Sequence, residues 1–266
     1  MNTTATGIQH VEYVMGMAVS FDTRPPVPGG HSLHDAVSWL HHVDATFSTY
    51  KADSEISRFA RGELTIATLS TETEEVLLRC LELTEITNGA FDAFAVPAPN
   101  GTRLDPSGYV KGWAIERAAM LLEGAGVENF CINAGGDIAV RGIPGPDQPW
   151  RVGIRHPYQE HHLATVLNLK GPIAVATSAT YERGAHIIDP RTDQPTTELA
   201  SATVVGPDLG TADAFATALF VLGLEGLDWI EQQDGYDAYI ITHDDTTRWS
   251  MGFPLAGPVG GDDPDA

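Results

Sequence analysis

The chain has 266 residues, of which 42% are apolar, and its formal net charge is −21 at pH 7. This length and composition allow a large buried core and exclude disorder over most of the chain. The negative charge argues against nucleic acid and anionic membrane as partners, because binding to a polyanion draws on clustered Lys and Arg side chains.

Hydrophobic periodicity predicts one strand and three helices in the first half of the chain. Apolar residues alternate over 13–24 as in a strand, and the sequence PPVPGG then ends it. Helices are predicted at 31–50, at 71–89 with a stop at Asn88-Gly89, and at 111–126.

The second half of the chain is predicted to consist mainly of strands. They are expected at 129–135, 149–156, 164–171, 172–180, 200–207, 238–242 and 248–253, with helices at 211–223 and 226–233. No repeat or change of composition marks a linker, so the sequence predicts a single α+β domain over residues 1–254. The acidic, Gly- and Pro-rich residues 255–266 are predicted to form a disordered tail.

The cysteines and the start of the chain bear on its location. Cys80 and Cys131 are flanked by apolar residues and are predicted to be reduced core residues. Residues 1–16 show neither the basic nor the apolar region of a secretion signal, and no segment reads as long enough to span a bilayer. We therefore expect a cytoplasmic protein without membrane insertion.

The predicted helix 211–223, TADAFATALFVLG, carries a carboxylate in an apolar segment. Asp213 lies one turn before Thr217, and apolar residues run almost all the way round the helix, so neither side chain has an obvious route to water. An unpaired buried charge is costly. Asp213 is therefore either neutralised by a partner or placed beside a cavity that contains a positive group.

Three other segments carry residue types that core packing does not need. In LDPSGYVKGWA, the Gly108 carbonyl, the Lys111 ammonium and free N–H groups at a helix start suit a phosphate or a metal-bound phosphate. The alternative there is a capped helix with a surface lysine. NAGGDIAVRG ends a strand in paired glycines and Asp137, which fits a tight turn or a close approach to a ligand.

The third segment, GAHIIDPRT, places His186 three residues before Asp189. Histidine titrates near neutral pH, so His186 is either a general base or a structural residue. The pairs His41-His42 and His161-His162 lack the spacing of a zinc site and are predicted to be solvated.

Taken together, these segments resemble the FAD:protein FMN transferase family, ApbE. Each is a loose pattern by itself, but nine of them follow one another in the family's order and cover most of the chain. They are residues 14–17, 47–59, 87–92, 104–119, 133–142, 149–154, 177–195, 200–208 and 211–223.

The resemblance implies a mixed, largely antiparallel sheet packed with helices, FAD as the donor substrate, and magnesium at its pyrophosphate. Family members transfer FMN from FAD to a Thr or Ser hydroxyl of an acceptor protein and release AMP; some instead hydrolyse FAD to FMN and AMP. By this resemblance, FAD contacts are expected at Met15, Tyr50, Ala90, Phe91, Asp92, Asp105, Lys111 and Ile187, and a catalytic base at His186. Metal ligands are expected at Gly108 through its carbonyl, at Asp213 and at Thr217. Asp and Thr at i and i+4 offer two hard oxygens from one helical face, so magnesium would be the partner of Asp213.

Three departures from the family pattern concern the site. Met17 stands where the family has Thr after Met-Gly, and Asp193 stands where it has Gly after Arg-Thr. The long stretch between GAFD and LD, which usually includes Trp-Gly, is shortened within residues 93–104, so a wall of the usual pocket is either absent or supplied by other residues. Two alternative functions therefore stay open: a metal-dependent FAD pyrophosphatase, and a flavin-binding protein without turnover.

Overall fold

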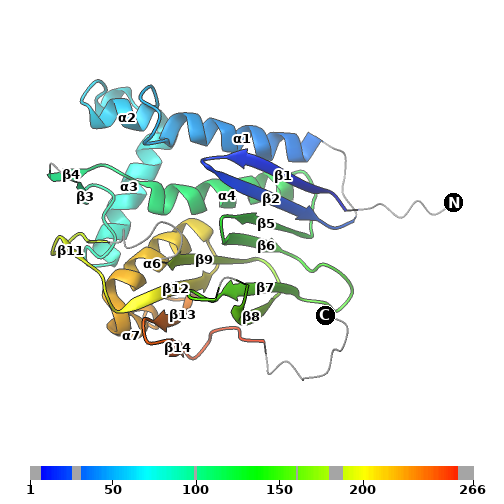
Figure 1. The fold of residues 1–266 in the computed structure, drawn as a ribbon. Helices are drawn as coiled ribbons and strands as arrows, with labels where there is room; N and C mark the ends of the chain where they lie inside the picture. Colours follow the sequence, from blue (N-terminus) through cyan, green and yellow to red (C-terminus); the bar gives the residue numbers. More distant parts are fainter. Residues whose placement is uncertain (1–6, 26–30, 99–100, 160, 180–187, 257–266) are drawn as a thin grey trace.

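The structure is a computed structural model that describes residues 7–25, 31–98, 101–159, 161–179 and 188–256 (Figure 1).

The centre of the fold is an eight-stranded sheet. The sheet has the order β1-β2-β5-β6-β9-β12-β13-β14, and each neighbouring pair is antiparallel. Its strands are β1 (Gln9–Val14), β2 (Met17–Thr23), β5 (Phe130–Ala134), β6 (Asp137–Arg141), β9 (Ile173–Ala179), β12 (Leu199–Gly206), β13 (Asp237–Thr242) and β14 (Thr247–Trp249). The predicted α+β class with a largely antiparallel sheet is confirmed.

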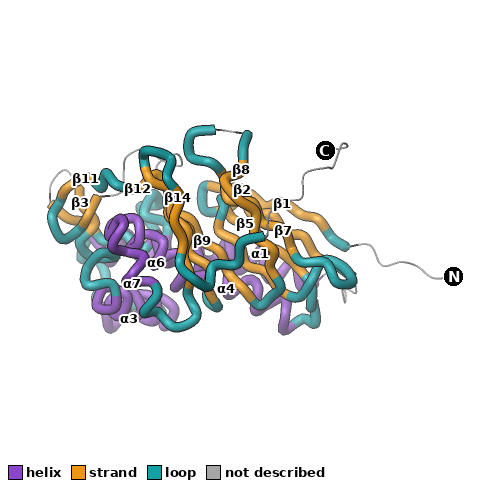
Figure 2. The backbone as a smooth tube through the Cα atoms, turned by 90° about the horizontal axis from the view of Figure 1, so that it is seen from below, coloured by secondary structure: helices purple, strands orange, loops and turns teal. Residues whose placement is uncertain are grey.

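The helices lie on one side of this sheet, as Figure 2 shows. Helices α4 and α6 contact the strands directly, and α1 packs on α4. The helices are α1 (His31–Phe47), α2 (Glu55–Ala60), α3 (Thr71–Ile86), α4 (Ser107–Gly124), α6 (Leu209–Leu222) and α7 (Gly226–Ile230), with 3₁₀ turns at Ile66–Thr68 and Gly223–Glu225.

The other face of the sheet is covered by a two-stranded ribbon, β7 (Trp150–Arg155) with β8 (Leu163–Leu169). Ile138 and Val140 of β6 belong to the apolar cluster under this ribbon, whereas Ala139 between them belongs to the cluster under the helices. Because the central strands are buried on both faces, they read as continuous apolar runs. Two further ribbons are β3 (Val96–Ala98) with β4 (Gly101–Arg103), and β10 (Ile188–Asp189) with β11 (Gln194–Pro195).

Several sequence predictions about elements were wrong. The helix predicted at 31–50 ends at Phe47, and the strand predicted at 248–253 ends at Trp249, before a turn at Met251 and Gly252. Residues 13–24 do not form one strand, because Met15 and Gly16 have φ angles of 53° and 74° and make the tight turn of the β1–β2 hairpin. Helix α4 begins at Ser107, four residues before the predicted start, so Lys111 lies in its second turn. At the other end of the chain, the Ala256 N–H donates to the Val166 carbonyl at 2.9 Å, so backbone contacts continue two residues past the predicted boundary of the domain.

The expectation that no segment is long enough to span a bilayer was wrong: the stretch Leu209–Ile230 is long and apolar enough to do so by length and composition. It contains α6, and 72% of its most apolar window is buried inside the protein. Packing against α4, β9 and β12 accounts for this apolar character, because α6 is a central helix of the core.

Both cysteines are free, as predicted. Cys80 is fully buried and Cys131 is half-buried. Burial raises the pKa of each thiol to about 12, so neither is a reactive thiolate at neutral pH.

Candidate functional site

A large cavity of about 850 Å³ opens where the ends of several elements meet. This volume lies within the usual range of small-molecule and cofactor sites. The cavity is bordered by the β1–β2 turn, the segment after α1, the start of α4, the end of β9 and one face of α6 from Asp213 to Val221. Its lining includes Met15, Met17, Phe47, Tyr50, Lys51, Phe91, Asp92, Val96, Arg103, Asp105, Gly108, Lys111, Thr177, Ser178, Asp213 and Thr217.

Every predicted site residue that the structure describes lines this cavity. The predicted flavin contacts Met15, Tyr50, Ala90, Phe91, Asp92, Asp105 and Lys111 lie along its wall, as do the predicted metal ligands Gly108, Asp213 and Thr217. His186 and Ile187 lie outside the described residues. Segments that lie up to about two hundred residues apart in the sequence therefore meet at one cavity, where they could contact the same ligand.

The charged centre of the cavity is Lys111, which lies between two buried carboxylates. Its Nζ atom is 2.8 Å from Asp137 Oδ2 and 3.7 Å from Asp213 Oδ1. The Asp137 side chain is completely buried, that of Asp213 is 4% exposed and that of Lys111 is 20% exposed. The interpretation of Lys111 as a surface lysine is therefore wrong, because its ammonium points into the protein toward these acids.

Asp213 is held by the backbone as well as by charge. Its Oδ2 atom accepts a 3.1 Å hydrogen bond from the N–H of Gly112 on α4. In a regular helix the N–H of Gly112 donates to the carbonyl of Gly108. Asp213 therefore accepts from the same N–H group that the Gly108 carbonyl would use. Both explanations for the buried acid hold: Asp213 has partners, and it also faces a cavity that contains an ammonium.

The predicted metal ligands are neighbours. Thr217 Oγ1 lies 3.3 Å from Ser178 Oγ, and a side-chain carbon built at Gly108 would lie 3.5 Å from Thr217 Oγ1. No group of three or more His, Cys, Asp or Glu side chains within the described ranges could hold a metal ion. One carboxylate, one hydroxyl and one carbonyl are nevertheless hard oxygen donors that fit Mg²⁺, which usually keeps other positions for water and substrate phosphate.

The shortened segment still contributes to the wall of the cavity. Val96 on β3 and Arg103 on β4 both line it. The Arg103 guanidinium donates to Asp105 Oδ2 at 2.9 Å, and Asp105 Oδ1 accepts a 3.1 Å hydrogen bond from the Ser107 N–H at the start of α4. A short hairpin therefore supplies an arginine where the family pattern has a longer stretch.

The other two departures are accommodated differently. Met17 lines the cavity with a thioether in place of a hydroxyl. Asp193 has a φ of 56°, the left-handed region that glycine favours, and Asp is one of the few other residues that tolerate it. Its N–H donates to the Asp189 carbonyl at 2.9 Å, so the β10–β11 turn keeps its form.

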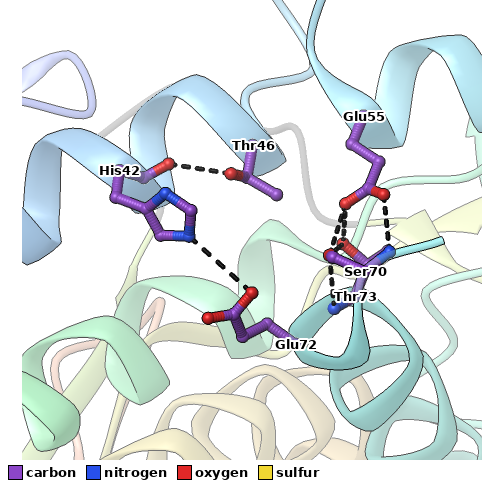
Figure 3. Close-up of polar contacts among 6 residues, drawn as sticks. All are labelled: His42, Thr46, Glu55, Ser70, Glu72 and Thr73. Atoms are coloured by element: carbon purple, nitrogen blue, oxygen red, sulfur yellow. Dashed lines mark hydrogen bonds and ion pairs between the residues drawn. The ribbon is translucent and has the colours of Figure 1, made fainter.

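A frame of polar side chains around Glu55 lies next in the chain to the segment after α1, where Ser48, Tyr50 and Lys51 line the wall of the cavity. The hydroxyls of Ser54 and Ser57 donate to the Ser48 carbonyl at 2.7 and 3.2 Å. Figure 3 shows the Glu55 carboxylate accepting hydrogen bonds from the Ser70 N–H and hydroxyl, at 2.7 and 2.6 Å, and from the Thr73 hydroxyl at 2.5 Å. Burial acts to raise the pKa of Glu55, but the hydrogen bonds from Ser70 and Thr73 outweigh it and the pKa lies below its ordinary value. This frame ties the start of α2 to the start of α3.

Nearby histidines are on the surface of the same region. His42 Nε2 lies 3.8 Å from Glu72 (Figure 3), and His41 Nε2 lies 2.9 Å from Glu12. Their side chains are 49% and 52% exposed, so the prediction that this pair is solvated is confirmed.

Sequence reasoning missed several lining residues, among them Ser178, Thr177, Lys51 and Arg103. Ser178 and Thr177 stand in the TSAT stretch, where two hydroxyls at the end of a buried strand are a signal of a polar site. Lys51 forms a 2.6 Å ion pair with Asp44, which no pattern in the sequence indicates.

Comparison of the chain with known proteins finds matches in one family. The sequence model of the ApbE family matches residues 15–100 and 96–240. The FAD:protein FMN transferase of Vibrio cholerae is 29% identical over 261 residues, covering 78% of both chains, and that of Rhodobacter capsulatus is 38% identical over 217 residues, covering 78% of this chain and 37% of the other. The solved structure of the flavin transferase ApbE from Vibrio cholerae superimposes with a TM-score of 0.80 and 25% identity, over 94% of this chain and 99% of that one.

Proposed function

This chain belongs to the ApbE family, and from that premise we propose that it is an FAD:protein FMN transferase. One observation carries the proposal: ten positions named from separate sequence motifs line one cavity. Relatives that bear this name match most of the chain. Dependence on magnesium, a Thr or Ser hydroxyl as acceptor, and release of AMP are the finer parts of the proposal.

In the proposed reaction, the cavity binds FAD and orients its pyrophosphate. The Lys111 ammonium, which lines the cavity, would stabilise negative phosphate oxygens. The N–H groups of Ser107, Tyr109 and Val110 at the start of α4 already donate to Asp105 and to the Pro106 carbonyl, so the expected set of free donors there is not present. Apolar lining from Met15, Met17 and Phe91 would hold an aromatic ring of the substrate.

Asp213, Thr217 and the Gly108 carbonyl would hold the magnesium ion. When bound, this cation offsets negative charge on the phosphates and on the leaving group. The three protein groups are fixed by α4 and α6, whose close contact through Gly112 and Asp213 sets their mutual position.

The transfer replaces the phosphoanhydride bond of FAD with a phosphoester bond to the acceptor. The acceptor hydroxyl oxygen bonds to the FMN phosphorus, the bond from that phosphorus to the AMP oxygen breaks, and the hydroxyl proton goes to a base. By its place in the family pattern, His186 is that base.

The test is to incubate the protein with FAD, with and without magnesium, and with and without a candidate acceptor that carries a Thr or Ser flavinylation motif. Flavin fluorescence on the denatured acceptor, with AMP in solution, is the expected result. FMN and AMP formed equally well without an acceptor would indicate a pyrophosphatase, and unchanged FAD under all conditions would indicate a binding protein.

A further inference from the structure

Asp137 is a buried acid that the proposed reaction does not use. It is the first residue of β6, following the turn made by Gly135 and Gly136, and its side chain has no exposed surface. Its Oδ1 atom accepts a 3.2 Å hydrogen bond from the Thr177 N–H, and its Oδ2 atom lies 2.8 Å from Lys111 Nζ. The buried negative charge of Asp137 on β6 therefore attracts the positive charge of Lys111 on α4.

The Lys111 ammonium lies at different distances from Asp137 and Asp213. It is within hydrogen-bond distance of Asp137 but 3.7 Å from Asp213. Asp137 is therefore the nearer of these two acids to Lys111. The three groups carry two negative charges and one positive charge, so the set has a net charge of −1. Thr217, one turn after Asp213 on α6, lies 3.3 Å from the Ser178 hydroxyl, and both hydroxyls line the same cavity.

We propose that Asp137 is a positioning residue that keeps Lys111 from neutralising Asp213, and so sets the affinity of the site for a divalent cation without ligating it. The inference rests on the proposed cation site at Asp213. If Asp137 lost its charge, Lys111 would have Asp213 as its remaining acidic partner in this set, and would compete directly with the cation. Removal of the Lys111 charge would have the opposite effect.

The proposal is tested by titrating the flavin-free protein with Mn²⁺ and following free Mn²⁺ by electron paramagnetic resonance. Asp137→Asn keeps an oxygen for the Thr177 N–H and removes both the charge and the acceptor oxygen that faces Lys111. It should weaken Mn²⁺ binding at least about tenfold, since one unit charge a few ångströms from a divalent ion has more than this effect even at an effective dielectric constant of about 20.

Two further variants distinguish an electrostatic effect of Asp137 on Lys111 from a general loss of structure at the site. Lys111→Met keeps the aliphatic stem and should tighten Mn²⁺ binding, and the double variant Asp137→Asn/Lys111→Met should return to within about threefold of the parent protein, because its net charge in this set is again −1. Asp44→Asn is the matched control, since it breaks the 2.6 Å pair with Lys51 on another wall of the same cavity. It should leave the Mn²⁺ affinity within about twofold.

Opposite shifts in the two single variants, with recovery in the double variant, would support the inference. An unchanged affinity in Asp137→Asn, or a fall in both single variants, would overturn it and leave Asp137 as a structural acid, whose loss lowers the melting temperature instead. If the parent protein binds no Mn²⁺, the inference and the cation site both fail. The FMN-transfer assay, read independently, would still decide the proposed function.

Discussion

The Asp213 carboxylate on α6 accepts a hydrogen bond from the backbone N–H of Gly112 on α4, at 3.1 Å. This contact requires a glycine. A side-chain carbon at Gly112 would overlap the Leu209 backbone and come within 3.0 Å of Asp213 Cβ. The position of the buried acid is thus set by how closely two helices approach each other.

Substitution Gly112→Ala should therefore destabilise the protein. Alanine favours a helix over glycine by about 1 kcal/mol, but the overlap with backbone must be relieved by moving α4 from α6, at a cost of about 1–3 kcal/mol above that gain. Urea unfolding measures the difference. Gly124→Ala, at the end of the same helix with no atom within 4 Å of the added carbon, is the control and should be neutral or stabilising.

Substitution Asp213→Asn should keep the fold and remove most metal-dependent transfer. The amide nearly preserves the volume and can still accept from Gly112, but it takes one negative ligand from a hard cation. Transfer rates are measured across a magnesium titration, alongside a melting curve. Activity within twofold of the parent protein at every magnesium concentration would remove Asp213 from the cation site.

The sequence predicts α6 within two residues because its apolar run is uninterrupted and because core helices have that composition. It does not predict the Met15 turn, since a non-glycine residue at positive φ has little local signal. The start of α4 is missed because Gly108 and Pro106 resemble a loop. The pairing of Lys111 with Asp137 depends on how α4 lies against the sheet, so neither local propensity nor spacing contains it.

The frame around Glu55 predicts a pH-dependent contribution to stability. Glu55→Gln loses the charge that three donors share and should lower the free energy of unfolding at pH 7 by about 1–3 kcal/mol. The folded-state pKa is depressed, so this contribution is present above the unfolded pKa of about 4.3 and is lost as pH falls through the folded value. Urea unfolding from pH 7 to pH 3 should show the two proteins converging in stability.

The control for this prediction is Glu75→Gln, the same exchange at an exposed position of α3. It should change stability by less than about 0.5 kcal/mol at any pH in the series. A constant difference between parent and Glu55→Gln down to pH 3 would mean that packing, rather than the carboxylate charge, ties α2 to α3.

His186 is predicted to act in turnover rather than in folding. His186→Asn should lower the transfer rate about 10²–10⁴-fold and leave the FAD affinity and melting temperature close to those of the parent protein. The parent protein should lose activity as pH falls through about 6.5, where a histidine base becomes protonated. A flat rate between pH 5.5 and pH 8, or a parallel loss of binding and stability, would make His186 a structural residue.

The central claim is that the cavity attaches FMN to another protein, and mass spectrometry of the acceptor tests it most directly. After incubation with FAD and magnesium, we expect the acceptor to gain the mass of one esterified FMN on a Thr or Ser residue, with one AMP released for each FMN attached. The Asp213→Asn variant should give neither product. An acceptor of unchanged mass, while FAD is consumed to free FMN and AMP, would contradict the account.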